Sequence, residues 1–458
     1  MAAGVLLEVG LRGGVANVLV AAGAVLVVIA LVTDRRIPNR PSRAVAAAAV
    51  VPLGFLAVRS SPWLATSNVV LATTLVAVAI GLSRSGSVSD TTLGRLVRRW
   101  ARAIPSAWSG PRALAPVLPE VSATSGQRAA RVGVAALVCV PVLALVVLLL
   151  AAADPVFAGL LTPDLHVGPV VGHLVWTALL AALAACVVGA AASDAEDPES
   201  RGGFGVLETA TMLALTAAVL GLFVTAQLVA VTSAGQRLVD RSGLTPAEYA
   251  RSGFFQLCWA TGLILSLLAV IRRLAAPGVM RAPLVRILAA VVPCLALGLV
   301  VVSLRRLGLY DDAFGLTMLR LWVMGAAVWM GVVLLFIAAR NAGVAWRREW
   351  VLGASLLVGA VLVVAADAAD PEAFVVRHNV ARAEHGADLD ARYLASLSDD
   401  AVPALVARWG ALGPDGRPIL EPALRCDEPP AGGAAALNAS VRRAEELRRQ
   451  ACNGTAGP

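Results

Sequence analysis

Long stretches of apolar residues dominate the chain and are separated by short segments that carry arginine. Val132–Ala153 is one such stretch, interrupted only by small residues and Pro141. A helix needs about 20 apolar residues to cross roughly 30 Å of bilayer hydrocarbon. Ten stretches approach this length, and none shows the alternation at every second residue that is typical of a membrane β-barrel. The pattern predicts an all-α, polytopic transmembrane helical bundle.

The predicted spans follow one another from the N-terminal region to residue 366. They are Val15–Val32, Ala44–Val58, Trp63–Leu82, Val132–Ala152, Val170–Ala192, Val206–Thr232, Phe254–Ile271, Leu284–Ser303, Phe314–Ala339 and Trp350–Ala366. The second span is short and contains Pro52, so it either crosses the membrane or re-enters on the same side. The first span is followed by Asp34-Arg35-Arg36 rather than a small-residue cleavage site, so we expect a retained helix rather than a signal peptide.

Arginines divide unequally between the two predicted sides of the membrane. Ten spans place the loops 33–43, 83–131, 193–205, 272–283 and 340–349 on one side, and these loops hold more than twice as many arginines as the N-terminal segment and the loops of the other side. Positive charge stays cytoplasmic. Both termini, and a C-terminal helical domain over 367–458 that follows the membrane domain 1–366, are therefore predicted to lie outside the cytoplasm.

Composition agrees with a membrane protein and disfavours a nucleic-acid binder. The chain is 58% hydrophobic and 15% charged, whereas soluble domains average about 25% charged residues. Every basic residue that contributes to the net charge of +8 is arginine. These arginines follow membrane orientation rather than forming a basic patch with stacking aromatics. Heavy use of Arg, Ala, Gly and Val is typical of a GC-rich bacterial genome, and the predicted location is the bacterial plasma membrane.

The cytoplasmic loop 83–131 contains a candidate interfacial helix. Leu93, Leu96, Val97, Trp100 and Ile104 share one helical face. The basic residues Arg95, Arg98, Arg99 and Arg102 take other positions. Such a helix is expected to lie on the inner leaflet and to bind anionic lipid. The alternative is a connector helix that packs on the bundle.

The polar C-terminal segment predicts several short helices. Asp370-Pro371 opens a helix that runs to Glu384, with proline in its favoured first turn. Two further helices are expected over Asp388–Leu397 and Asp400–Trp409, and a last amphipathic helix over Val441–Ala451.

Four strings in the second half of the chain resemble a bacterial integral-membrane family that is known as domains of unknown function 4153 and 4173. They are Leu222–Leu228, Ala247–Phe255, Tyr310–Arg320, and the tail residues Asp370–Phe374, Arg377–Asn379, Tyr393–Ser398 and Asp400–Leu405. After Gln227 the chain departs from the family's glycine-rich aromatic turn. The resemblance implies a shared membrane architecture and gives no activity. In the tail, the family strings contain Asp370, Arg377, Asn379 and Asp400.

Polar residues at membrane depth are the first candidates for a functional role. Arg320 is predicted two turns into the ninth span, with Asp311, Asp312 or Glu208 as partners; the alternative is snorkelling to the interface. Gln227 is expected to join helices by hydrogen bonding. The outer residues Glu248, Tyr249 and Arg251 form either a site or a surface salt bridge.

No metal site, cofactor or nucleotide-binding motif is predicted. His166 and His173 have two-turn spacing but lack a third ligand, and His378 and His385 share that spacing with Asn379 and Glu384 near them. Three functions remain open. The first is a structural or regulatory envelope protein that presents its external domain to a partner protein. The second is a permease-like transporter of a small solute, and the third is a membrane enzyme acting on a lipid-linked substrate.

Four cysteines lie in apolar runs, but Cys426 and Cys452 lie in the tail, where an oxidising compartment permits a disulfide. We predict that Cys426→Ser abolishes a mobility difference between non-reducing and reducing gels that the unmodified chain shows. Equal mobility of the unmodified chain under both conditions would count against the disulfide.

Overall fold

The computed structural model describes residues 6, 17–33, 40–82, 125–161, 203–230, 253–344, 350–413, 416–421, 433 and 435–452. These residues are overwhelmingly helical, and their only β-type pairing is an isolated bridge between Phe204 and Ala275. The all-α prediction is therefore confirmed for this part of the chain.

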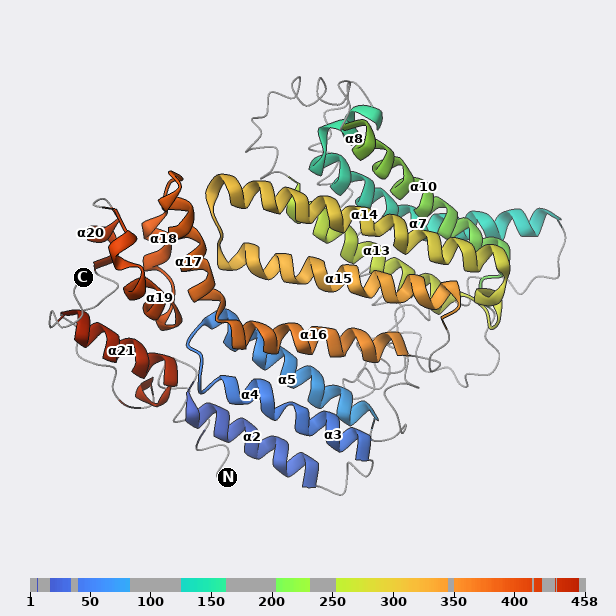
Figure 1. Ribbon diagram of the computed structural model, residues 1–458. Helices are drawn as coiled ribbons and strands as arrows, with labels where there is room; N and C mark the ends of the chain where they lie inside the picture. The colour runs from blue at the N-terminus through green and yellow to red at the C-terminus, as the bar shows by residue number, and fades with distance from the viewer. Residues whose placement is uncertain are drawn as a thin grey trace. The chain divides into compact units, whose positions relative to one another are not determined.

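The longer helices correspond to predicted spans (Figure 1). They are α2 (Val18–Thr33), α5 (Pro62–Leu82), α7 (Ser125–Ala153), α10 (Val206–Ala230), α13 (Phe254–Leu274), α14 (Pro283–Phe314), α15 (Met318–Ala342) and α16 (Trp350–Ala369). Six of them, α5, α10, α13, α14, α15 and α16, are long and apolar enough to cross a membrane. Shorter apolar helical stretches lie within α2 and α7. These helices agree with a multi-pass membrane protein, whereas the count of ten spans stays a prediction.

The second predicted span is not one apolar helix. Residues 40–55 form α3 (Arg40–Ala48) and α4 (Val50–Phe55), with a break at Ala49. Pro52 lies inside α4, where it removes a backbone donor and favours a break in the preceding turn. Val170–Ala192, the fifth predicted span, lies outside the residues that the structure describes.

The boundary between the eighth and ninth predicted spans was wrong. The helix expected to end at Ser303 continues to Phe314, so Arg305, Arg306 and Asp311 are helical rather than in a loop. The next helix begins at Met318, which places Arg320 in its first turn. Charged residues end an apolar run without ending a helix, because here they have partners: Arg306 pairs with Asp154, and Asp311 lies beside His378.

The contacts between residues divide the chain into two compact units. Unit 1 contains residues 1–92, 311–325 and 347–458, and unit 2 contains 93–310 and 326–346. In unit 1, α2, α3, α4 and α5 pack together and α16 packs against α4 and α5 (Figure 1). In unit 2, α7 contacts α10 and α13, and Phe157 meets Phe223 edge to face with ring centroids 5.6 Å apart.

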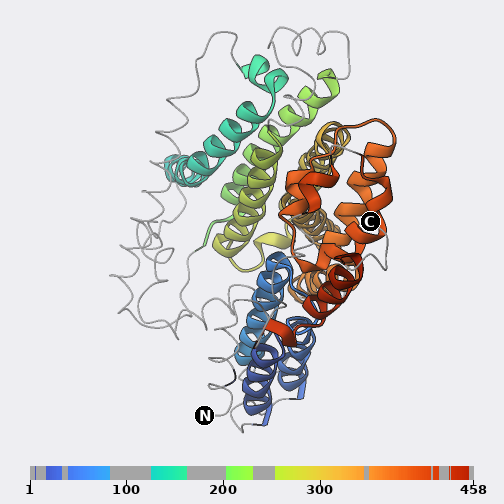
Figure 2. The same cartoon turned by 90° about the vertical axis from the view of Figure 1, so that its left-hand side faces the viewer.

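The C-terminal segment belongs to unit 1 and consists of short helices (Figure 2, orange to red). They are α17 (Pro371–Glu384), α18 (Ala391–Ala395), α19 (Val402–Ala407), α20 (Arg417–Leu420) and α21 (Ala439–Cys452), with single 3-10 turns at Asp399–Ala401, Trp409–Ala411 and Ala435–Leu437. Val375, Val376 and Val380 of α17 are fully buried in an apolar core that includes Leu316 and Met318. The core of the tail therefore also covers the turn between α14 and α15.

Candidate functional site

The turn between α4 and α5 is held by a carboxylate from the C-terminal segment. Asp400, which is 1% exposed, accepts hydrogen bonds from the backbone nitrogens of Ser60 (3.0 Å) and Ser61 (3.0 Å) and from the Ser60 hydroxyl (3.1 Å). A carboxylate that accepts several donors replaces the water that these groups lose on burial. One side chain therefore satisfies the polar groups of a distant turn.

A second buried acid orders the segment that carries Asp400. Glu372, 2% exposed, accepts hydrogen bonds from both the backbone nitrogen and the hydroxyl of Ser398, each at 2.7 Å. The Ser398 hydroxyl also caps the 3-10 turn at Asp400 and lies 3.2 Å from the Ser60 hydroxyl. Ser398 rather than Asp399 or Asp400 is the cap, because both aspartates lie inside the turn.

Arg59 joins the same turn to the start of α17. Its guanidinium pairs with Asp370 at 2.5 Å, and its Nε donates to the main-chain oxygen of Asp367 at 2.8 Å. Asp370 also caps α17 by accepting from the nitrogen of Ala373, and it has a positive φ of 55°. Aspartate tolerates this conformation better than most residues, and the ion pair and the cap hold it there.

The last helix begins on the α4–α5 turn. Asn438 donates from its amide nitrogen to the carbonyl of Arg59 at 2.9 Å, and the next two residues donate main-chain hydrogen bonds to Ala57 and Val58 at 3.0 and 3.1 Å. The turn is thus bound by main-chain as well as side-chain donors.

The turn between α14 and α15 is bound in a comparable way by α17. The amide of Asn379 accepts from the nitrogen of Leu316 and donates to its carbonyl, both at 2.8 Å. Gly315 has φ of 77°, and an added Cβ would lie 2.6 Å from the Asn379 oxygen, so only glycine fits this approach. The Asn379 amide thus pairs with Leu316 as a neighbouring backbone would, and it fixes the position of the turn against α17.

Further contacts extend this binding to both ends of the turn. The hydroxyl of Tyr393 accepts from the nitrogen of Met318 at 2.6 Å, which satisfies an unpaired donor at the start of α15. His378 lies 3.0 Å from a carboxylate oxygen of Asp311. Arg320 donates to the carbonyl of Gly315.

We call these two sets of contacts the loop clasp: residues 370–452 bind the α4–α5 turn (56–61) and the α14–α15 turn (315–317). Both turns, the C-terminal end of α16 and the tail consequently lie on one side of unit 1.

Burial raises the pKa values of two clasp acids. Desolvation is the largest cause for both Glu372 and Asp370; hydrogen bonds from Ser398 oppose it at Glu372, and Arg59 with the Ala373 nitrogen opposes it at Asp370. A raised pKa means that the folded chain binds the proton more tightly than the unfolded chain. This contribution to stability is therefore complete at low pH and is lost as pH rises through the raised values.

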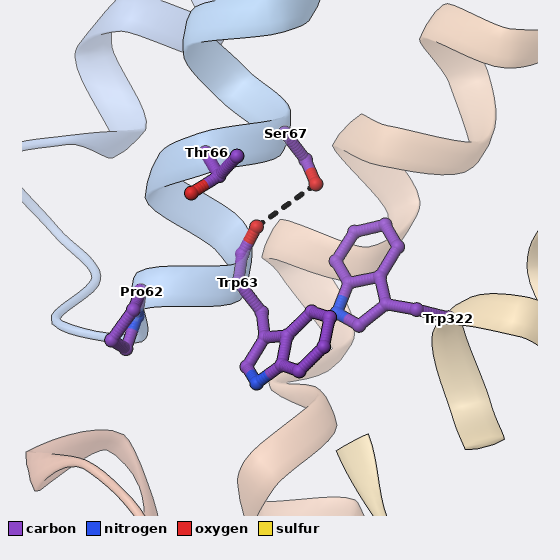
Figure 3. A pocket seen from close by; sticks show the side chains of 5 residues that line it. All are labelled: Pro62, Trp63, Thr66, Ser67 and Trp322. Atoms are coloured by element: carbon purple, nitrogen blue, oxygen red, sulfur yellow. Dashed lines mark hydrogen bonds between the residues drawn. The ribbon is translucent and has the colours of Figure 1, made fainter. Parts of the chain in front are cut away.

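Two tryptophans lie close to the clasped turns. Trp63 in the first turn of α5 and Trp322 near the start of α15 line an open hollow of about 450 Å³, together with Pro62, Thr66 and Ser67 (Figure 3). The lining is mostly apolar, and Trp63 is 40% exposed. Tryptophan is enriched where a membrane meets water, and both of these tryptophans lie near the first residues of long apolar helices.

Unit 2 contains a buried ion pair that the sequence analysis did not predict. Arg306 of α14 (3% exposed) pairs with Asp154 (fully buried), which follows α7, and Gln227 of α10 donates to the same carboxylate at 2.9 Å. Asp154 also accepts from the nitrogen of Phe157 at 2.8 Å and so caps α8 (Pro155–Leu161). Three long helices therefore meet at one carboxylate, and Gln227 connects helices as expected of such a residue.

The remaining candidate residues are distributed between the two units. In unit 1, Asp312 accepts from Arg382 through its carbonyl, and Arg377 is exposed on α17. In unit 2, Glu208 is buried at the start of α10, where its carboxylate lies against Gly205. Cys452 is disulfide-bonded, but its predicted partner Cys426 lies outside the described residues. Also outside them are Glu248, Tyr249, Arg251, His166, His173, and the proposed lipid-binding Arg95, Arg98, Arg99 and Arg102.

Several clasp residues were missed because their partners are far away in the sequence. Arg59 was counted only for topology, Glu372 lay in the family string Asp370–Phe374 without an assigned role, and Ser60 and Asn438 carried no signal. Asp154-Pro155 is a recognisable helix-start pair, which marks Asp154 as a cap but does not identify Arg306. Among the described residues, no three His, Cys, Asp or Glu side chains are arranged to hold a metal ion.

The helical character of the described residues and their six long apolar helices are those of a multi-pass membrane protein. The family model for a domain of unknown function, DUF4153, matches residues 44–407, well over half of the 458 residues, and the chain belongs to this family. No curated protein and no solved structure matches the chain.

The clasp predicts that cysteines at two positions will join. In a Ser60→Cys/Ser398→Cys double variant, the side-chain atoms start 3.2 Å apart, so a disulfide should form under mild oxidation and link the α4–α5 turn to the tail. A protease site placed in the loop after α5 would reveal the link as fragments that separate only after reduction. Each single variant is the control, and separation without reduction in the double variant would contradict the clasp.

Gly253 predicts a second measurable effect. It has φ of 86°, and an added Cβ would lie 2.3 Å from the carbonyl of Ala153, beside Arg306. Gly253→Ala should therefore lower stability by about 1–3 kcal/mol through backbone strain alone. Gly262, in the interior of α13 with no atom near its Cβ position, is the matched control, and its alanine variant should raise stability by about 0.5–1 kcal/mol. Thermal unfolding in detergent measures both, and equal effects would contradict the assignment.

Proposed function

We propose that this protein is a structural or regulatory component of the bacterial plasma membrane that presents its C-terminal helices to a partner protein outside the cytoplasm. The loop clasp is the observation that carries this proposal. A C-terminal segment that served only as a flexible extension would need no contacts to two separate turns. Instead, Asp370, Asp400 and Asn379 each bind a membrane-helix turn.

The internal use of these acids favours a binding role over a catalytic one. The carboxylates of Glu372 and Asp400 are buried and accept hydrogen bonds from protein donors. Groups occupied in this way hold structure and are poorly placed to meet a substrate. What remains available to a partner is the outer surface of the tail helices.

The outer face of α21 suggests the chemistry of that partner. Val441, Ala444 and Ala451 are buried against the rest of the tail, and Arg448 pairs with Asp399 at 2.7 Å. The opposite face exposes Arg442, Arg443 and Arg449. Arg449 contacts Glu446 at 2.9 Å, but exposed pairs of this kind contribute little. A basic face on a fixed helix suits an acidic segment of a protein.

Two observations support an external position for the tail. Cys452 is disulfide-bonded, and disulfides persist mainly in oxidising compartments. The tail also shares its side with turns that belong to the arginine-poor side of the predicted topology.

A photo-crosslinking residue at position 443 tests the partner role in intact cells. We expect one discrete protein adduct, and we expect Arg442→Glu/Arg449→Glu to reduce it several-fold because the basic face loses its attraction for acidic groups. The Ser60–Ser398 cysteine link serves as the control that the clasp is intact. Adducts with lipid alone, or a protein adduct insensitive to the charge change, would contradict the proposal.

A permease-like function is the second candidate, favoured by the buried Arg306–Asp154 pair and Gln227. Ionisable groups buried among membrane helices frequently mark solute or ion pathways. Solute uptake by vesicles that Arg306→Gln abolishes, while α21 variants leave it unchanged, would support the permease and not the partner-binding role.

A further inference from the structure

Two buried oxygen atoms near the clasp have no hydrogen-bond donor. Asp367 in the last turn of α16 and Asn68 of α5 are both fully buried, and the Asn68 amide donates to Asp367 Oδ1 at 2.9 Å. The other carboxylate oxygen, Oδ2, and the Asn68 carbonyl oxygen lack any partner. Leaving two acceptors buried without donors is unfavourable. The pair therefore needs one more hydrogen-bond donor than its two side chains supply when Asp367 is ionised.

We propose that Asp367 and Asn68 form a neutral acid–amide pair that binds one proton at the extramembrane end of α16. With the proton on Oδ2, the carboxyl group gains an O–H donor while Oδ1 continues to accept. The Asn68 carbonyl oxygen, which otherwise has no donor, would accept a hydrogen bond from this O–H. One proton thus turns a single hydrogen bond into a double one and leaves neither oxygen unpaired.

The surroundings favour a proton over a metal cation. A metal ion of the calcium or magnesium type requires about six oxygen ligands, whereas the described residues hold no group of three acidic, histidine or cysteine side chains suited to one. The helices α4 and α5, which pack on α16, contain no ionisable residue. A proton needs only the two oxygens that are present.

The neighbouring charges connect this proton to the clasp. Arg59 is the cation beside the site: its Nε binds the main-chain oxygen of Asp367, and its guanidinium is already paired with Asp370. Glu372 from α17 and Asp400 from the 3-10 turn add acidic groups on the same side. An ionised Asp367 would therefore add another negative charge to a group that has one arginine. Loss of the proton weakens the clasp, and its binding tightens it.

The Asp367→Asn variant tests whether residue 367 is a neutral acid or an ionised carboxylate. Its amide copies the protonated acid by donating to Asn68 and accepting from it, so Asp367→Asn should retain the Ser60–Ser398 cysteine link and the melting midpoint of the full-length protein in detergent. The link should also become less dependent on pH between mildly acidic and mildly alkaline conditions. Asp400→Asn is the matched control, because Asp400 faces three donors and its replacement should reduce the link several-fold.

Infrared spectroscopy supplies a direct readout. One component of the carbonyl stretch of protonated carboxyl groups should be present in the unmodified protein and missing in Asp367→Asn, and Asn68→Leu should shift that component because the hydrogen-bond partner is lost. If the Asp367 variant does not fold, the shift in Asn68→Leu alone still decides the matter. Asp367→Asn that loses the link as fully as Asp400→Asn, or a carboxyl band unchanged in both variants, would overturn the proposal. Neither outcome depends on whether the tail binds a partner.

Discussion

Backbone polar groups in the turns that join membrane helices need hydrogen-bond partners. In this protein one buried carboxylate accepts from several such groups of a single turn. Asp400 accepts from two main-chain nitrogens and one hydroxyl of the α4–α5 turn. Hydrogen bonds to a charged group contribute about 1.5–3 kcal/mol each. The position of the tail, the cap of α17 and the start of α21 all follow from binding this turn, because each contributes a further contact to the same few residues.

The same physical device recurs in unit 2 with different residues. Asp154 caps a short helix, pairs with Arg306 and accepts from Gln227. Breaking a buried ion pair by removing one partner costs about 3–5 kcal/mol, because the other charge stays buried without compensation. The main effect of such a pair is to determine which helix ends meet; its net contribution to stability is small. In both units, then, a buried aspartate beside a helix end brings together predominantly apolar helices.

The family strings acquire a physical meaning once the turns are in place. Asp370, Asn379, Tyr393 and Asp400 all come from the tail strings on which the resemblance rests, and each contacts a turn or the end of a membrane helix. Gly315, from the Tyr310–Arg320 string, leaves the space that Asn379 occupies. These strings therefore describe how a tail is attached to membrane helices.

Hydrophobic length alone determined that this chain is an all-helical membrane protein, because hydrocarbon requires each crossing segment to satisfy its own backbone. Local signals also determined the start of α17, where Asp370 precedes Pro371. The partners of Arg59 and Arg306 could not be deduced, since they lie 311 and 152 residues away along the chain and no local pattern selects one acid among many. The helix boundary at Phe314 was likewise decided by tertiary contacts. Polar residues that read as a loop remain helical there, because the tail binds the turn that follows.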